Sequence, residues 1–470
     1  MFAGLSEEKW NDKAMRSRTP HSRKFLDYIG SNWATNKQPL PKKSAVAQFA
    51  AKRRDSVAKA FKGKVLVFEA GAAKTRANDT DYMYRADTAF AHLTGWGSAT
   101  VPDSVLVIDA SAKTAKSILF FRETAGRDSE EFFANAAIGE FWVGARPSLK
   151  QVSALLGIET RPLAELKPFL KTIAKEKICN SNKDAKLAEF VSELRLIKDS
   201  YEIAEMRKAV AASIKGFEES AKSLKVAVGK QRGERIVETA FYAQARIEGN
   251  ALGYDTISAS GAHACTLHWI VNDGPVNKNE LLLLDAGVEV DSLYTADITR
   301  TLPTSGKFSD VQRKIYDAVL EAADAAFKVA KPGAKFRDVH DAAMKVIATK
   351  TAEWGLLPIT AEESLKPENQ LHRRWMVHGT SHHLGLDVHD CAKARLEMYL
   401  EATLQPGMVF TIEPGLYFQP DDLLVPKEFR GIGVRIEDDI LITKTGAENL
   451  SAALPRKSKD VEKWLAKVQR

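Results

Sequence analysis

The chain alternates between helical and strand-like hydrophobic patterns from about residue 45 onward. Apolar residues at helical spacing over 45–61 (AVAQFAAKRRDSVAKAF) predict a helix. Short apolar runs at 64–71, 104–111 and 116–123 predict strands, and the last two should be neighbours. Helices and strands that alternate in this way predict a small α/β domain, which ends near residue 185.

Longer helices are predicted in the second half of the chain. Residues 186–220 have a helical period, with Asp199 or Ser200 as an N-cap inside the run. Residues 309–330 and 336–355 predict two further helices. Long covering helices beside strands that carry polar residues favour an α+β fold, in which a curved sheet lies over an active site.

Acidic and imidazole side chains fall inside strand-like apolar runs in the last third of the chain. They are Asp285, Asp297, His382, Glu413 and Glu437. A carboxylate in a hydrophobic strand is costly unless a positive charge balances it. Each residue alone has an ordinary explanation, such as a turn, an ion-paired edge or a core histidine. Together, four carboxylates and one imidazole predict a site that holds two divalent metal ions.

Strand parity supports one shared cleft, because alternate residues of a strand face the same way. Over 432–437, Arg435 and Glu437 share the face opposite the apolar residues. Over 384–390, read as a strand, Asp387 and His389 oppose the apolar residues in the same way. Each segment therefore has one face for a core and a polar face that could look into a cleft.

Four blocks make the pattern resemble a known family. They are DAGVEVDSLYTADITRTLPTSGKFS, HGTSHHLGLDVHD, PGMVFTIEPGLY and RGIGVRIEDDILIT. The ordered set resembles the pita-bread metallopeptidases, and within them aminopeptidase P and prolidase. The resemblance extends over roughly residues 75–455 and is weakest between 150 and 190. It implies a smaller α/β N-terminal domain followed by a pita-bread catalytic domain.

The resemblance also implies roles for the metal-binding residues. Asp285 would bind one ion, Asp297 and Glu437 would bridge both, and His382 and Glu413 would complete the other. A bridging water or hydroxide would then be the nucleophile at neutral pH. Manganese is the expected metal, while cobalt, zinc or iron could bind the same groups.

Further residues of the cleft follow from the same resemblance. The expected catalytic residues are His268, His378, His389, Glu413 and Arg435, with Glu413 also shuttling protons. The histidines would line the substrate cleft and stabilise the tetrahedral intermediate. For Arg435 the alternative is an ion pair with a carboxylate such as Asp438. Thr299 fits a hydrogen bond to a ligating carboxylate.

Two rival activities share this ligand set. The first is an aminopeptidase that acts on peptides with proline in the second position, and EFWVGAR, NDTDYMYR and GIGVRIEDD favour it. The second is a prolidase, restricted to Xaa-Pro dipeptides. A remote third reading is a non-catalytic pita-bread binding protein.

Asp79 and Trp142 match family positions near the cleft mouth, and the resembled proteins predict a homo-oligomer, either dimer or tetramer.

Composition adds limits on location and partners. The net charge is +7, and basic residues cluster in residues 1–44, which we interpret as a basic N-terminal extension. No aromatic pattern interleaves with that cluster, so no nucleic-acid partner is expected. Three cysteines without a C-x-x-C pair indicate a reducing compartment, and no apolar run reaches membrane-span length. We therefore expect a cytoplasmic protein with domains at 45–185 and 186–470.

Overall fold

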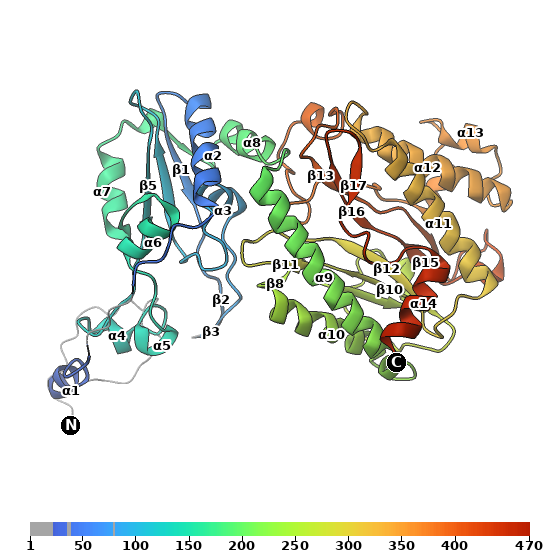
Figure 1. Ribbon diagram of the computed structural model, residues 1–470, viewed down its shortest axis with the longest axis horizontal. Coiled ribbons are helices and arrows are strands. Elements are labelled where there is room, and N and C mark those ends of the chain that lie inside the picture. The colour runs from blue at the N-terminus through green and yellow to red at the C-terminus, as the bar shows by residue number, and fades with distance from the viewer. Residues whose placement is uncertain (1–21, 35–38, 79) are drawn as a thin grey trace. The chain divides into compact units, whose positions relative to one another are not determined.

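The computed structural model describes residues 22–34, 39–78 and 80–470. The chain forms two compact units, residues 1–188 and 189–470, each with its own strands and helices (Figure 1). Most of the predicted basic extension, residues 1–44, lies outside the described residues, and so does Asp79. The division at residues 44 and 185 remains a prediction.

Unit 1 is built on a five-stranded sheet in the order β6-β5-β4-β1-β7. The strands of unit 1 are β1 (Val65–Glu69), β2 (Thr75–Ala77), β3 (Thr80–Asp81), β4 (Val105–Asp109), β5 (Lys116–Phe121), β6 (Glu159–Pro162) and β7 (Ile178–Asn180), of which β2 and β3 form a separate pair. Its helices are α1 (Arg23–Ile29), α2 (Ala47–Ala60), α3 (Thr88–Thr94), α4 (Glu131–Ala134), α5 (Glu140–Val143), α6 (Leu149–Leu156) and α7 (Leu166–Lys171). Helix α8 (Ala185–Glu193) contains the boundary between the units.

The core of unit 1 follows from the predicted strands. Strands β1, β4 and β5 correspond to the three apolar runs, and β4 pairs antiparallel with β5 as predicted. Val67, Val107 and Phe120 lie on one face of the sheet, where Leu166 and Phe169 of α7 pack against them. Helices α2 and α3 pack on β4, which completes an α/β unit.

Unit 2 combines short sheets with long helices. Its strands are β8 (Ala251–Leu252), β9 (Ile257–Ser260), β10 (Leu281–Ala286), β11 (Val288–Glu289), β12 (Ile298–Pro303), β13 (Val409–Ile412), β14 (Gly415–Phe418), β15 (Ile432–Arg435), β16 (Asp438–Ile442) and β17 (Ala447–Asn449). Its helices are α9 (Ser200–Ala227), α10 (Gly233–Glu248), α11 (Asp310–Val329), α12 (Phe336–Glu353), α13 (Ala361–Leu365) and α14 (Ser458–Val468).

Helices cover these strands, as the polar and apolar pattern predicts. Helix α9 packs on α10 and α11 on α12, while α10 contacts β9 and α11 contacts β13, β14 and β15 (Figure 1). The predicted N-cap is confirmed, because the Asp199 side chain accepts from the backbone N–H groups of Tyr201 and Glu202. Helices packed over several short sheets confirm the predicted α+β class.

The strand predicted over residues 384–390 is wrong. His383 forms an isolated bridge with Phe410, and the chain then bends back, with the Asp390 N–H donating to the His383 carbonyl at 2.8 Å. The bend has a tertiary cause, because the Arg195 guanidinium holds the Asp390 carboxylate at 2.9 Å. Val388 and His389, predicted on opposite faces, consequently line the same cavity.

Two further properties concern the cysteines and the lengths of the helices. Cys179, Cys265 and Cys391 are buried free thiols. Within residues 22–34, 39–78 and 80–470, every helix is too short or too polar to span a bilayer.

Candidate metal centre and substrate cavity

A cavity of about 530 Å³ opens in unit 2. It brings together every residue that the sequence analysis selected for ligation or catalysis. These are His268, Asp285, Asp297, His378, His382, His389, Glu413, Arg435 and Glu437. The residues come from five separate stretches of chain, so their convergence is a property of the fold rather than of any one motif.

Strand pairing places three of the carboxylates. Asp285 lies near the end of β10 and is paired with Thr299 of β12, while Asp297 lies immediately before β12. Glu437 lies between β15 and β16 and forms a bridge with the same Thr299. The carboxylates therefore lie at strand ends, where a side chain can turn into a cavity.

Strand β13 places His382 and Glu413. The Thr411 N–H donates to the His382 carbonyl at 2.9 Å, and the Glu413 N–H donates to the Thr380 carbonyl at 2.9 Å. The segment that carries His382 thus runs beside β13, and both side chains reach the carboxylates described above.

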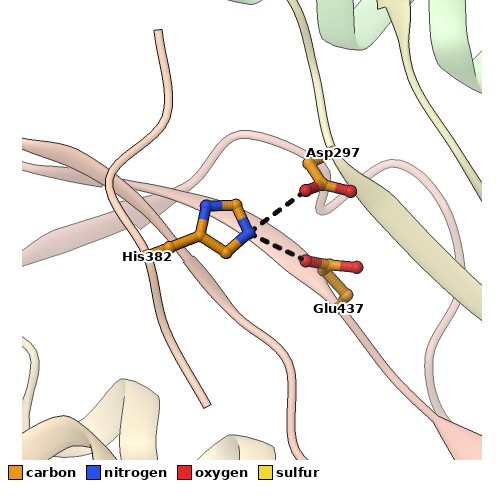
Figure 2. A group of neighbouring side chains, drawn as sticks. All are labelled: Asp297, His382 and Glu437. Atoms are coloured by element: carbon orange, nitrogen blue, oxygen red, sulfur yellow. Dashed lines mark ion pairs between the residues drawn. The ribbon is translucent and has the colours of Figure 1, made fainter. Parts of the chain in front are cut away.

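The His382 ring is at the centre of the acidic group. Its Nε2 lies 3.2 Å from Asp297 Oδ2, 3.5 Å from Glu413 Oε1 and 3.9 Å from Glu437 Oε1. Figure 2 shows the ring directed between Asp297 and Glu437. Asp297, His382 and Glu437 each offer one ligand atom, and these three atoms lie within 4.8 Å of one another. Three donors that converge on so small a volume fit a single cation.

The charges of this group are poorly balanced by the chain itself. Burial raises the pKa of Asp297 and of Glu437, and it raises that of Glu413 to about 7. Burial alone would lower the pKa of His382, but the hydrogen bond to Asp297 and the charge of Glu413 outweigh it and raise that pKa to about 9. Buried acids that favour their protonated forms lack positive charge, which divalent cations would supply. The oxygen-rich donor set therefore fits the predicted metal ions.

Arg435 lines the cavity and is also paired with a carboxylate. Its side chain is buried, and Nη2 lies 2.5 Å from Asp285 Oδ2, while Nε donates to Thr299 Oγ1 at 3.1 Å. Arg435 therefore forms an ion pair, as the alternative interpretation foresaw, and its partner is Asp285 in place of Asp438. Asp285 is accordingly turned toward Arg435 and lies outside the three-residue donor group.

The hydrogen bond predicted for Thr299 is present. Its hydroxyl donates to Glu437 Oε2 at 2.7 Å while it accepts from Arg435. Thr299 therefore fixes the rotation of one predicted bridging carboxylate.

Sequence reasoning missed two tyrosines in the cavity region. The Tyr254 hydroxyl lies 2.6 Å from Asp285 Oδ1 and 2.5 Å from Asp297 Oδ1. The Tyr417 hydroxyl lies 2.7 Å from His378 Nε2 and accepts from Arg435 at 3.1 Å. Tyr254 precedes β9 in an irregular segment, which gives no periodic signal. Tyr417 lies in the same sequence block as Glu413, residues 406–417. That shared block was the signal that could have identified Tyr417.

Family comparisons cover both units. A model described as metallopeptidase family M24 matches residues 204–444. A second, described as aminopeptidase P, N-terminal domain, matches residues 50–179. These two matches agree with the resemblance drawn from the sequence blocks.

Individual relatives are similar over nearly their full lengths. Xaa-Pro aminopeptidase 1 of Streptomyces coelicolor is 45% identical over 465 residues, which cover 95% of this chain and 93% of that protein. Xaa-Pro aminopeptidase of Escherichia coli is 30% identical over 437 residues, covering 88% and 96%. The solved structure of E. coli aminopeptidase P with the inhibitor Pro-Leu superposes with a TM-score of 0.80 at 29% identity, covering 91% of this chain and 100% of that one.

Proposed function

The chain belongs to metallopeptidase family M24, and on that premise we propose that it is an Xaa-Pro aminopeptidase that releases the first residue of peptides with proline second. The observation that carries the proposal is the imidazole of His382, faced by three carboxylates inside a substrate-sized cavity. The relatives named Xaa-Pro aminopeptidase supply the substrate class.

Five residues would hold two divalent ions in this proposal. They are Asp285, Asp297, His382, Glu413 and Glu437. Two such ions, when bound, lower the pKa of a shared water from about 15.7 towards about 7 and polarise the scissile carbonyl. Manganese is the ion we expect, because carboxylate oxygens predominate among the donors.

Glu413 is the residue we assign to proton transfer. Its side chain lines the cavity, where a carboxylate would be in reach of the attacking water. One of its oxygens lies 3.7 Å from His378 Nδ1, on the cavity side. It could therefore accept a proton from the attacking water and pass it to the leaving nitrogen.

The cavity histidines His378 and His389 are suited to remain neutral near physiological pH. Burial and the charge of Arg435 lower the pKa of His378 to about 4, and burial also lowers that of His389. His378 Nδ1 lies 2.7 Å from the Gly379 carbonyl, so the hydrogen-bond network assigns the proton to Nδ1 and leaves Nε2 to accept from Tyr417. With its N–H on Gly379 and its other nitrogen on Tyr417, His378 offers the cavity a neutral ring face, and His389 would be the ring that donates to a developing oxyanion without adding a competing charge.

Proline selectivity follows from the nature of the bond. An Xaa-Pro bond has no N–H at the leaving nitrogen, so a site for it must recognise the ring itself. Leu267, Ile270 and Val388 line the cavity together with His268 and His378. These apolar and imidazole side chains offer surfaces for a proline ring.

A comparison of peptide lengths tests the proposal. Purified protein with Mn²⁺ is incubated with an Xaa-Pro dipeptide, an Xaa-Pro-Xaa tripeptide and an Xaa-Ala-Xaa control. We expect the tripeptide to be cleaved at least as well as the dipeptide, and the alanine control to lose most of kcat/KM. Cleavage of the dipeptide alone would identify a prolidase, and binding of metal and peptide without hydrolysis would identify a binding protein.

The division between ligands and cleft residues has its own test. His389→Ala should lower kcat by about 10²- to 10³-fold and retain the metal content of the wild type, because its role lies in the transition state. Loss of bound metal in this variant would show that the division is wrong.

Assembly and location are further parts of the proposal. We expect a cytoplasmic homo-oligomer, dimer or tetramer. Phe141 and Trp142 of α5 are 63% and 48% exposed, so both are available to a neighbouring copy. Light scattering of active enzyme would contradict this expectation if it gave the mass of a single chain.

A further inference from the structure

One fully buried carboxylate of unit 2 lies outside the cavity. Glu234 is the second residue of α10, and its side chain has no exposed surface. Each of its oxygens takes two nitrogen partners. Oε1 lies 2.8 Å from the Ser260 backbone nitrogen and 2.8 Å from His263 Nδ1, and Oε2 lies 2.7 Å from the Gly274 backbone nitrogen and 2.9 Å from Trp269 Nε1. The carboxylate is therefore saturated by contacts within one stretch of chain.

That stretch, residues 260–274, forms one wall of the cavity, and we call it the wall segment. It carries Leu267, His268 and Ile270, all of which line the cavity. Residues 266–274 form neither helix nor strand. Because no sheet ladder fixes residues 266–274, their position depends on individual contacts. Glu234 contacts Trp269 and Gly274 there, in addition to Ser260 at the end of β9 and His263.

The packing around Glu234 leaves little freedom for the wall segment. The rings of His263 and Trp269 stack with centroids 3.8 Å apart, so the two side-chain partners brace each other. A Cβ on Gly274 would approach the His263 ring to 2.5 Å and Glu234 Oε2 to 2.8 Å. Glycine is therefore needed for the backbone to reach the carboxylate.

We propose that Glu234 is a positioning residue, whose carboxylate holds the wall segment so that His268 faces the proposed metal centre. This role rests on the proposed peptidase function for its effect on turnover. It does not rest on that function for its effect on the wall segment itself.

The geometry requires a carboxylate and not merely a side chain of that size. Both partners of Oε2 are N–H groups, and the two partners of Oε1 are a backbone N–H and an imidazole nitrogen. A glutamine could accept on its single oxygen, but its amide nitrogen would face the remaining donors. Glu234→Gln is thus nearly isosteric and breaks half of the contacts, which makes it the informative variant.

Glu280→Gln provides a matched control. Glu280 is a half-buried carboxylate close to the same chain segment, and it accepts from the Ser260 hydroxyl at 3.2 Å and from Asn277 Nδ2 at 3.1 Å. The Ser260 contact reaches only the first residue of the wall segment, which strand β9 already fixes by its pairing with β10, and Asn277 lies beyond the other end of the segment. We expect Glu234→Gln to lower kcat/KM at least about tenfold with metal content retained, and Glu280→Gln to change it by less than about twofold.

A double-mutant cycle separates positioning from general stability. If Glu234 acts through His268, adding Glu234→Gln to the His268→Ala variant should cost less than about threefold, because the group being positioned is already gone. An equal loss in both backgrounds, or no loss in either, would overturn the proposal.

Hydrogen exchange tests the wall segment without using turnover. Amide exchange over residues 261–274 should accelerate in Glu234→Gln and remain unchanged in Glu280→Gln, while exchange in α11 stays constant. If the wild type cleaves no Xaa-Pro peptide, the proposed function fails, and this measurement still decides the role of Glu234. If Glu234→Gln does not fold, Trp269→Phe removes one partner and keeps a ring to stack. Unchanged exchange and turnover in that variant would equally overturn the role.

Discussion

Unit 2 contains two kinds of buried carboxylate, and they are balanced in opposite ways. Asp390 and Asp438 lie in the scaffold, each beside two basic side chains. Asp297, Glu413 and Glu437 lie in the cavity, around a single imidazole. Asp297 and Glu437 are as buried as the scaffold carboxylates, so the difference lies in the charges that the chain provides.

The scaffold carboxylates are neutralised from within the protein. Asp390 lies 2.9 Å from Arg195 Nε and 3.5 Å from Lys198 Nζ. Burial alone would raise its pKa, but these two cations outweigh burial and lower it to about 2. Asp438 has the same arrangement with Arg300 and Arg456, which lower its pKa as well.

The cavity carboxylates have no comparable partners, and their pKa values are raised. Arg435, the cation among them, is paired with Asp285. The contrast suggests a criterion for reading such structures. A buried acid with a lowered pKa is balanced by its own chain, whereas a group of acids with raised pKa values fits a site whose charge comes from a bound cation.

Removal of divalent ions should produce the largest effect on this contrast. Chelation, or the change Asp297→Ala, should lower kcat/KM by at least about 10³-fold, because several kcal/mol of charge stabilisation are lost. Added Mn²⁺ should restore the chelated wild type and fail to restore the variant. Metal analysis and turnover provide the measurement, and full activity of Asp297→Ala would refute the proposed centre.

Breaking a scaffold pair should affect folding instead. Asp390→Ala leaves Arg195 and Lys198 buried without their partner, which should lower the free energy of unfolding by about 3–5 kcal/mol. Denaturant unfolding in the presence of chelator measures this loss. A change below about 1 kcal/mol would mean that the two cations find other partners.

Much of this arrangement could be predicted from local sequence. The capping box of Asp199 and Glu202 depends on residues three apart, and the apolar runs of β1, β4 and β5 depend on short-range periodicity. The metal-ligand candidates were found because carboxylates are rare inside apolar runs. Their convergence into one site was predicted from the unusual set as a whole, with strand parity in support, and the family resemblance added the role of each residue.

The features that local sequence could not predict depend on contacts between distant residues. The bend at 384–390 is held by Asp390 and Arg195, which are 195 residues apart. Arg435 turns to Asp285, 150 residues away, and no strand pattern could select that partner over the adjacent Asp438. Glu234 reads as an ordinary first-turn helix residue, because its four partners appear only when the wall segment folds against it.

The pH dependence of the metal-free protein should distinguish the two kinds of carboxylate. Folding raises the pKa of Glu413 to about 7, against about 4.3 when unfolded, so its contribution is lost as pH rises between these values. His382, raised to about 9 from about 6.5, loses its contribution as pH rises through 9. The lowered pKa of Asp390 puts its loss below about pH 4, outside this range.

The melting temperature of chelated protein should therefore fall by a few degrees between about pH 5 and 9. Bound Mn²⁺ should reduce this slope, because the metal ions keep the carboxylates ionised throughout this pH range. Glu413→Gln should flatten the slope without metal. A melting temperature that rises over this range would contradict the charge imbalance in the cavity.

The smallest effect should come from a residue that only orients a cavity carboxylate. Thr299→Val keeps the shape of the side chain but removes the hydroxyl that donates to Glu437 Oε2 and accepts from Arg435 Nε. Loss of such a contact should lower metal affinity by about tenfold, while the ligands themselves remain. Thr301→Val is the matched control, because Thr301 lies on the same face of β12 and bonds to the backbone of Arg435, with no carboxylate contact. Metal titration of the two variants should show weakened binding in Thr299→Val and a change below about twofold in Thr301→Val, with unfolding free energies lowered similarly in both. Equal metal affinities in the two variants would indicate that the strand, and not the hydroxyl of Thr299, orients Glu437.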